Sequence, residues 1–268
     1  MQHWFVQTFD PIAFHIFGLP IRWYGISYIA GFLLAALILK VRIRTDPRYP
    51  LAFSVLDFLT YAAIGAIAGG RLGEIVFYNS EYYLDHPLEM LFLWKGGMAS
   101  HGGMIGVFVA ALIFARRHRI NPLVLIDDVV LATLPGLFLG RIANFVNSEM
   151  VGSVTDVWWA VVYPIHDMQP RHPVQLYQAA AEGPFLACIL LTALRLKMSP
   201  GGLASLFLIS YGGLRCLTEI FRERDPAYLG YWHGMTNGQL LSIGMIVLGI
   251  VCLTIFDLSK RLRQSHRR

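Results

Sequence analysis

The sequence predicts an all-α polytopic membrane protein with about seven transmembrane helices, forming a single integral-membrane domain over residues 1–268. Of its 268 residues 56% are hydrophobic and 15% are charged, and the mean hydropathy is +0.53. A soluble domain usually carries about 25% charged residues. Seven apolar segments approach the roughly 20 residues that a helix needs to cross a bilayer. They cover residues 18–39, 54–78, 98–115, 123–140, 174–194, 201–221 and 238–256.

Basic residues fix the expected orientation, because cytoplasmic loops of membrane proteins carry an excess of Lys and Arg. With seven spans, the basic clusters fall in every second connection, all on one side. They are Lys40, Arg42, Arg44 and Arg48; Arg116, Arg117 and Arg119; Arg195 and Lys197; and Lys260, Arg261, Arg263, Arg267 and Arg268. The N-terminus is therefore expected outside and the C-terminus in the cytoplasm. The net charge of +5 suits anionic lipid at that face, so no nucleic-acid partner is expected.

The N-terminal segment and the cysteines are read as structural. Residues 1–17 lack the basic start of a cleavable signal peptide, and their aromatic residues indicate an amphipathic segment at the outer interface. The cysteines lie singly in different apolar spans and are interpreted as packing residues. They are Cys188, Cys216 and Cys252. No disulfide, metal or cofactor is expected.

The first two spans each carry polar groups with two interpretations. Tyr24 lies at a span end, where Trp and Tyr usually form an aromatic belt, but its hydroxyl could instead bind a phosphate. In the second span, Arg71 and Glu74 are spaced i and i+3, which favours a structural pair. Four glycines there should let a neighbouring helix approach. They are Gly65, Gly69, Gly70 and Gly73.

A glycine-rich stretch surrounds His101. Five glycines between residues 96 and 106 predict a poor helix whose backbone is open to close approach. His101 is either an interfacial residue or part of a polar site, and its local sequence leaves both open.

The densest polar cluster follows the fourth apolar segment, between Gly140 and Gly152 (GRIANFVNSEMVG). Charged and amide side chains at the edge of hydrocarbon are costly unless they face a partner or a polar cavity. Arg141 alone could be a helix-end cap at headgroup depth. With two asparagines and Glu149 close behind, its five-donor fork favours a phosphate site.

Other polar residues of this half are given structural or open interpretations. Asp127 and Asp128 lie in the first turns of the fourth span, where acids complement the helix dipole. Residues 142–173 form the longest outer connection and are expected to make a small periplasmic head or lid. Glu182 lies near the middle of the fifth span and needs a polar partner, which the sequence does not identify.

The sixth span carries a polar stripe in its outer half. At 100° per residue its four members fall within about 80° of one another. They are Tyr211, Arg215, Glu219 and Arg222. Together with Tyr24, His101, Arg141 and Asn144, they are all expected in the outer half of the bilayer. This convergence predicts one pocket at headgroup depth, with arginines for a phosphate and groups for proton transfer.

Four motifs resemble those of the prolipoprotein diacylglyceryl transferase family. They are His101–Gly106 (HGGMIG), Gly140–Gly152, Arg171–Tyr177 (RHPVQLY) and the stripe of the sixth span. Members are bacterial inner-membrane enzymes that move diacylglyceryl from phosphatidylglycerol to the lipobox cysteine thiol of a preprolipoprotein, releasing glycerol phosphate. The resemblance carries the family's functional positions onto ten residues here. They are Tyr24, His101, Arg141, Asn144, Glu149, Gly152, Tyr211, Arg215, Glu219 and Arg222.

The resemblance also implies roles for these residues. A thiol must lose its proton to attack carbon, and His101 is the implied base, although it could instead position the lipid. Arg141 and Arg215 would stabilise the leaving phosphate, and Tyr24 and Asn144 would orient the headgroup.

Two further implications concern the carboxylates and the head. Glu149 and Glu219 are expected to hold the arginines. The head after Gly152 departs from the family pattern, so the peptide-binding surface is left open. The competing function, a transporter or receptor for an anionic lipid headgroup, lacks the internal repeat expected of many transporters.

Overall fold

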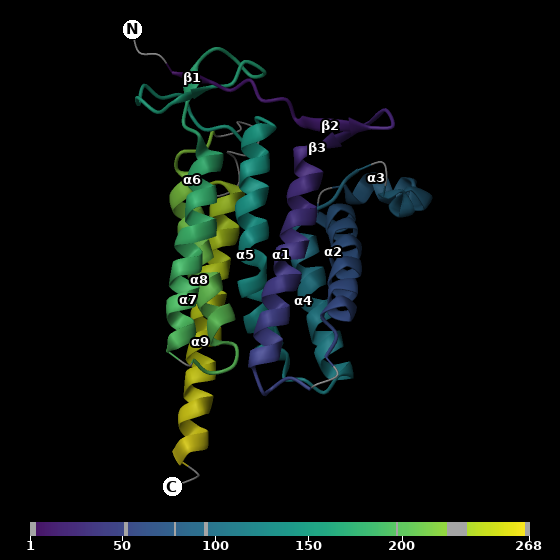
Figure 1. Cartoon of the computed structure of the whole chain (residues 1–268), viewed down its shortest axis with the longest axis vertical. Helices are drawn as coiled ribbons and strands as arrows, with labels where there is room; N and C mark the ends of the chain where they lie inside the picture. Colours follow the sequence, from purple (N-terminus) through teal and green to yellow (C-terminus); the bar gives the residue numbers. More distant parts are fainter. Residues whose placement is uncertain are drawn as a thin grey trace. The chain divides into compact units, whose positions relative to one another are not determined.

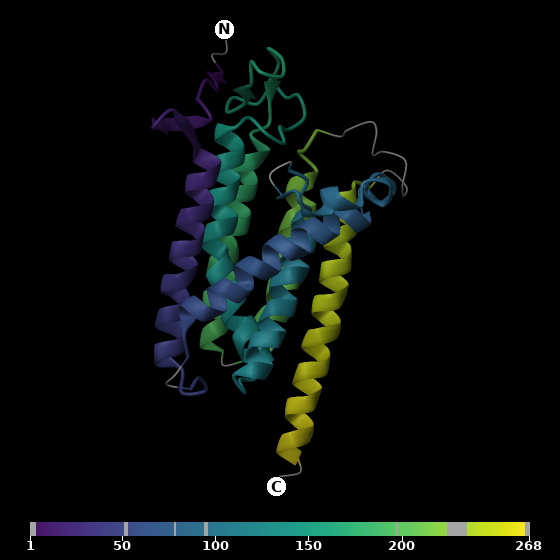
Figure 2. The ribbon, with the colours of Figure 1, turned by 90° about the vertical axis from the view of Figure 1, so that its right-hand side faces the viewer.

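The computed structural model describes residues 4–50, 53–77, 79–93, 96–196, 198–223 and 235–265, drawn in Figures 1 and 2. The chain divides into two compact units. One combines Met1–Ile38 with Val129–Arg268, and the other is Leu39–Asp128. Each unit is described by itself.

The fold is mostly helical, as predicted. The long helices are α1 (Trp23–Thr45), α2 (Val55–Phe77), α4 (Ser100–Arg117), α5 (Pro122–Val146), α8 (Gly202–Glu219) and α9 (Asn237–Ser265). Between α5 and α8, α6 (Val174–Ala180) continues through the π-helical turn η3 (Ala181–Phe185) into α7 (Leu186–Arg195). Short α3 (Ser80–Asp85) and η1 (Pro87–Leu91) follow α2.

Five helical stretches among the described residues are long and apolar enough to cross a membrane. They are α1, residues Val55–Val76 of α2, α5, the continuous Val174–Arg195 and residues Gly238–Ser259 of α9. The other two expected spans are also helical, but α4 ends on Arg116 and Arg117, and α8 carries Arg215 and Glu219. The expected segments are therefore helices, while the count of seven spans stays a prediction.

Helices α2 and α4 are neighbours (Figures 1 and 2), and they pack through facing glycines. A Cβ placed on Gly69 would lie 2.3 Å from the carbonyl oxygen of Gly102, and one on Gly106 only 1.9 Å from that of Gly65. This confirms that the glycines of the second span admit a neighbouring helix. The expectation of a poor helix around His101 is wrong, because the chain is helical from Ser100 and α2 is what approaches its glycines.

Arg71 does not pair with Glu74, contrary to the sequence interpretation. Its Nε donates to the carbonyl of Met90, and Nη1 donates to that of Gly96. Its guanidinium also lies 5.0 Å from the centre of the Tyr83 ring. The Arg71 side chain therefore holds the segment between α2 and α4 through the backbone carbonyls of that segment.

Asp128 is likewise more than a helix-dipole partner. Its carboxylate accepts 2.7 Å hydrogen bonds from Arg42 Nε and from the Tyr49 hydroxyl. Because Asp128 is buried, this pairing offsets the cost of removing its charge from water. The pKa of Tyr49 is raised by burial and by the neighbouring carboxylate.

The chain between α5 and α6 folds back on the ends of those helices as a small head (Figure 1). Strand β4 (Val161–Val162) pairs in parallel with β1 (Phe5–Val6) and antiparallel with β5 (Pro170–Arg171). Its buried core consists of Phe145, Val151, Val161 and Tyr163. Since α5 continues to Val146, this irregular part begins later than residue 142.

The N-terminal segment includes a β-hairpin of β2 (Ile12–Ile16) and β3 (Leu19–Arg22). Its turn has Phe17 and Gly18 at positive φ, 49° and 81°. Four large apolar side chains of the hairpin are exposed, namely Phe14, Ile16, Phe17 and Leu19. The amphipathic segment expected there is thus an extended one.

The close approach of α2 and α4 gives a matched pair of tests within one helix. Gly106→Ala should destabilise the protein by about 1–3 kcal/mol, because its Cβ would strike a backbone oxygen and force the helices apart. Gly103→Ala should be neutral or slightly stabilising, since its Cβ would lie 3.4 Å from Ala66 O and alanine favours a helix. Thermal unfolding in detergent measures both, and equal melting temperatures would contradict the packing described.

Candidate functional site

Glu182 is the centre of a buried polar cluster in the first unit. Its side chain has 0% exposure and lies on η3, the π-helical turn that interrupts the helix at Gly183-Pro184. Proline lacks the N–H that a regular helix needs, and π-turns relieve such interruptions. A side chain on Gly183 would clash with Phe138 of α5, so this turn lies directly against α5.

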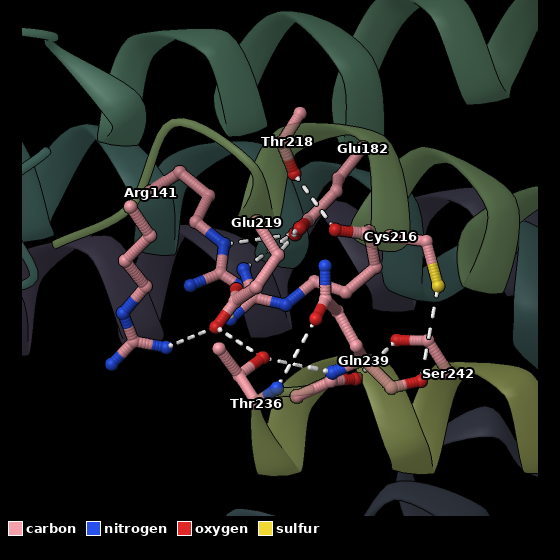
Figure 3. Close-up of polar contacts among 11 residues, drawn as sticks. Arg141, Glu182, Cys216, Thr218, Glu219, Thr236, Gln239 and Ser242 are labelled. Atoms are coloured by element: carbon pink, nitrogen blue, oxygen red, sulfur yellow. Dashed lines mark hydrogen bonds and ion pairs between the residues drawn. The ribbon is translucent and has the colours of Figure 1, made fainter. Parts of the chain in front are cut away.

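Two arginines from different helices bind Glu182 (Figure 3). Arg141 of α5 donates from Nε to Oε2 at 2.8 Å and from Nη2 to Oε1 at 3.3 Å. Arg215 of α8 places Nη1 3.5 Å from Oε1. The contact with Arg215 is an ion pair without hydrogen-bond geometry, because Nη1 is buried and makes no hydrogen bond.

Glu219 extends the cluster toward the start of α9. Arg215 Nη2 lies 3.1 Å from Glu219 Oε2, and Arg222 Nη1 lies 3.1 Å from Oε1. The Thr236 hydroxyl donates to the same Oε1 at 3.3 Å. The expectation that Glu219 holds arginines is confirmed.

The cluster carries a formal charge of +1, since three guanidiniums face two carboxylates. Glu182 and Glu219 are buried, and the side chains of Arg141 and Arg215 are 15% and 12% exposed. An unbalanced charge in such an environment is costly. An anion with one negative charge would balance the +1 of the cluster. Arg215 Nη1, which makes no hydrogen bond, could donate one to such an anion.

Tyr211 joins the same cluster from one turn earlier on α8. It is positioned to interact electrostatically with Glu182, Arg141 and Arg215. Its ring stacks on Phe207, with centroids 5.4 Å apart. The stripe of the sixth span is therefore real, and Arg141 of α5 reaches it.

Glu149 occupies a strained turn just beyond α5. Its carboxylate accepts from Asn144 Nδ2 at 2.8 Å and from Asn147 Nδ2 at 3.0 Å. The flanking Ser148 and Met150 have φ of 56° and 53°, a conformation that costs free energy for residues other than glycine. Glu149 forms none of the ion pairs found among the described residues, so the expectation that it holds an arginine is wrong.

Tyr24 lies near this turn by way of Tyr28. The two hydroxyls are 3.3 Å apart, and Tyr28 interacts electrostatically with Glu149. Helix α1 can approach α5 because Gly31 faces Gly136, where a Cβ on Gly31 would lie 3.1 Å from the Gly136 Cα. Tyr24 is thus linked to Glu149 through Tyr28, and it makes no hydrogen bond to an arginine of the described residues.

Gly152 is needed for packing. A Cβ there would lie 2.3 Å from the His172 carbonyl oxygen. Its own carbonyl accepts from Arg171 Nη1 at 3.0 Å, and its backbone bridges to Arg222. Gly152 therefore ties the head to the end of α8.

His101 is the one candidate whose side chain lies outside the described residues. Its backbone is in the first turn of α4, in the unit Leu39–Asp128. The other candidates all belong to the first unit.

Sequence reasoning missed several residues that support the site. Gln175 of α6 donates to the Glu149 carbonyl at 2.6 Å and accepts from the Tyr163 hydroxyl at 3.1 Å. Arg171 pairs with Asp167 and Glu223. The hydrogen bond to Asp167 raises the pKa of Arg171 and lowers that of the Asp167 carboxyl. The RHPVQLY motif was the only signal for these residues.

All three cysteines lie among the described residues and are free thiols. Cys216 Sγ lies 3.8 Å from the Gln239 carbonyl and so faces α9, as its helical offset from Arg215 implies. Cys188 is exposed and free. No group of three His, Cys, Asp or Glu residues among those described could hold a metal ion.

Comparison with known proteins gives a consistent result. The sequence model of the prolipoprotein diacylglyceryl transferase family matches residues 11–255. A phosphatidylglycerol–prolipoprotein diacylglyceryl transferase of Nitrosomonas europaea is 42% identical over 247 residues, 91% of this chain and 89% of the relative. Proteins of the same name are 44% identical in Azospirillum brasilense (90% and 92% covered) and 42% identical in Dechloromonas aromatica (94% and 97%).

The cluster predicts that Glu182 is needed for stability. Glu182→Gln should lower the free energy of unfolding by about 3–5 kcal/mol, because it removes the charge that pairs with Arg141 and Arg215, whose side chains are only 15% and 12% exposed. Glu81→Gln, at an exposed position of α3, should have little effect. Thermal or denaturant unfolding in detergent measures both, and similar stability of the two variants would contradict this role.

Proposed function

The chain belongs to the prolipoprotein diacylglyceryl transferase family, and on that premise we propose that it transfers diacylglyceryl from phosphatidylglycerol to preprolipoproteins. The acceptor is the thiol of the lipobox cysteine. The product is a thioether, and glycerol phosphate is released. The relatives' printed names give phosphatidylglycerol and prolipoprotein as their substrates.

The observation that supports this proposal most is the surplus positive charge around Glu182 and Glu219. The phosphodiester of phosphatidylglycerol carries one negative charge, which balances the formal +1 of the cluster. Arg215 Nη1, buried without a hydrogen bond, would donate to a phosphate oxygen. Arginine suits this role because its fork matches phosphate geometry.

The reaction that we infer is the one that the family resemblance implies for these residues. The acceptor thiol gives its proton to His101, and the thiolate attacks the diacylglycerol carbon that bears the phosphate. As the S–C bond forms, the C–O bond breaks and its electron pair stays on the phosphate. Arg141 and Arg215, fixed by Glu182, stabilise that charge without having to reorganise.

The remaining candidates serve binding. Seven residues shape the lipid site directly or hold the side chains that do. They are Tyr24, Asn144, Glu149, Gly152, Tyr211, Glu219 and Arg222. A transporter or receptor for an anionic headgroup would use a similar cationic cluster, but the family membership favours the transferase.

The membrane arrangement is part of the proposal. We infer seven spans, with α4 and α8 completing the five apolar stretches, in one integral domain of a bacterial inner membrane. The N-terminus and the head, residues 147–173, face the periplasm, and the C-terminus faces the cytoplasm. The alternating basic clusters support this orientation.

The orientation is tested with reporter fusions. A cytoplasmic reporter placed after Arg268 should be active, and an exported phosphatase at the same place inactive, because the basic C-terminal segment should remain inside. The reverse result would refute the orientation.

The function is tested with purified protein, phosphatidylglycerol and a lipobox peptide. The product should be a lipidated peptide whose bond resists hydroxylamine, as a thioether does. Arg141→Lys should lose most of this activity, since a point charge does not replace a two-pronged grip on phosphate. Arg195→Lys, exposed at the end of α7, should remain active. Absence of transfer by the folded wild-type protein would refute the function, and full activity of Arg141→Lys would refute the phosphate site.

A further inference from the structure

Gln178 of α6 is buried without a polar partner. Its side chain is 1% exposed, and neither Nε2 nor Oε1 makes a hydrogen bond to any described residue. A buried amide without partners is costly. Unlike a packing residue, it can donate two hydrogen bonds and accept two.

The position of Gln178 relates it to the cationic cluster. Gln175, Gln178 and Glu182 fall within about 60° of one another around the helix, so they share one face. Gln175 is bound to Glu149 and Tyr163, and Glu182 is bound to the arginines. Gln178 lies between these two contacts, with both of its neighbours on that face already occupied.

Helix α5 and the turn that follows it supply the partners in both contacts. Arg141 reaches Glu182, and Glu149 beyond the helix end meets Gln175. Asn144 lies one turn after Arg141 and is buried, and its Nδ2 is committed to Glu149. The Gln178 amide is therefore in the interval between the arginines and the head.

We propose that Gln178 binds the glycerol hydroxyls of the phosphatidylglycerol headgroup and so selects this lipid. The proposal rests on the proposed function. A hydroxyl both donates and accepts, so two neighbouring hydroxyls satisfy both ends of the amide. A phosphate oxygen only accepts and an ammonium only donates, so neither group can satisfy both the oxygen and the nitrogen of the amide.

Distance along the helix agrees with this assignment. Four residues separate Gln178 from Glu182, a rise of roughly 6 Å. A three-carbon glycerol attached to a phosphate at the arginines spans a similar length. A peptide backbone also donates and accepts, but the phosphate cluster one turn away favours the headgroup.

The test compares phosphatidylglycerol with phosphatidylethanol, which has the same phosphodiester charge and no headgroup hydroxyl. Wild-type protein should show a higher kcat/KM for phosphatidylglycerol. Gln178→Met keeps the length of the side chain and removes the amide. It should raise the KM for phosphatidylglycerol about tenfold, the value of one good hydrogen bond. The ratio of kcat/KM for phosphatidylglycerol to kcat/KM for phosphatidylethanol should fall toward one. The KM for the peptide should not change, and the melting temperature should not fall.

Gln175→Met is the matched control on the same face. It breaks the contacts to Glu149 and Tyr163 and should lower the melting temperature without changing the ratio between the two lipids. Gln178→Ala repeats the test if the Met variant does not fold.

Three results would overturn the proposal. Wild-type protein could use both lipids equally while still transferring, which leaves the proposed function standing. Gln178→Met could keep the wild-type lipid preference and change only the melting temperature of the protein. Gln178 would then have a structural role and no role in lipid selection. The variant could instead raise the KM for the peptide alone, which assigns Gln178 to the acceptor. A wild-type protein that transfers nothing removes the proposed function itself.

Discussion

The arrangement of the first unit depends on one buried carboxylate. Glu182 lies within a membrane-length helix at 0% exposure, where an ionised group without partners is expensive. Arg141 of α5 and Arg215 of α8 both reach it and offset that cost. Since the three groups come from three separate segments, this cluster fixes how α5, α6–α7 and α8 meet. The π-helical turn at Pro184 provides the local backbone that carries Glu182.

A cluster built only for stability would balance its charges. This one keeps a third arginine, Arg222, against two carboxylates, and the Arg222 side chain is 32% exposed while those of Arg141 and Arg215 are 15% and 12% exposed. Pairing lowers the cost of burying Arg141 and Arg215 while leaving the net field positive. The same glutamates that stabilise the fold thus keep the arginines from adopting other rotamers, so a bound phosphate would meet donors already in place.

Local patterns were readable from the sequence, and tertiary partners were not. The apolar segments became helices, and the i, i+4 spacing of Arg215 and Glu219 became an ion pair, because helical periodicity alone sets those neighbours. Glu182 and Arg141 are 41 residues apart, and no period relates them. Arg71 and Asp128 were misread for the same reason. Their partners, the carbonyls before α4 and Arg42 with Tyr49, come from other elements. The side chain of His101 is outside the described residues, so its proposed role still rests on the resemblance.

The head is connected to the cationic cluster through backbone as well as charge. Arg222 uses its side chain to hold Glu219, while its backbone bridges to Gly152. Arg171 binds the Gly152 carbonyl and the Glu223 carboxylate, which closes the same junction from the head. Only glycine fits at 152 because the His172 carbonyl lies where a Cβ would be. A change at Gly152 would therefore displace Arg222 and, through Glu219, Arg215. This explains in physical terms how a residue without a side chain can belong to the site.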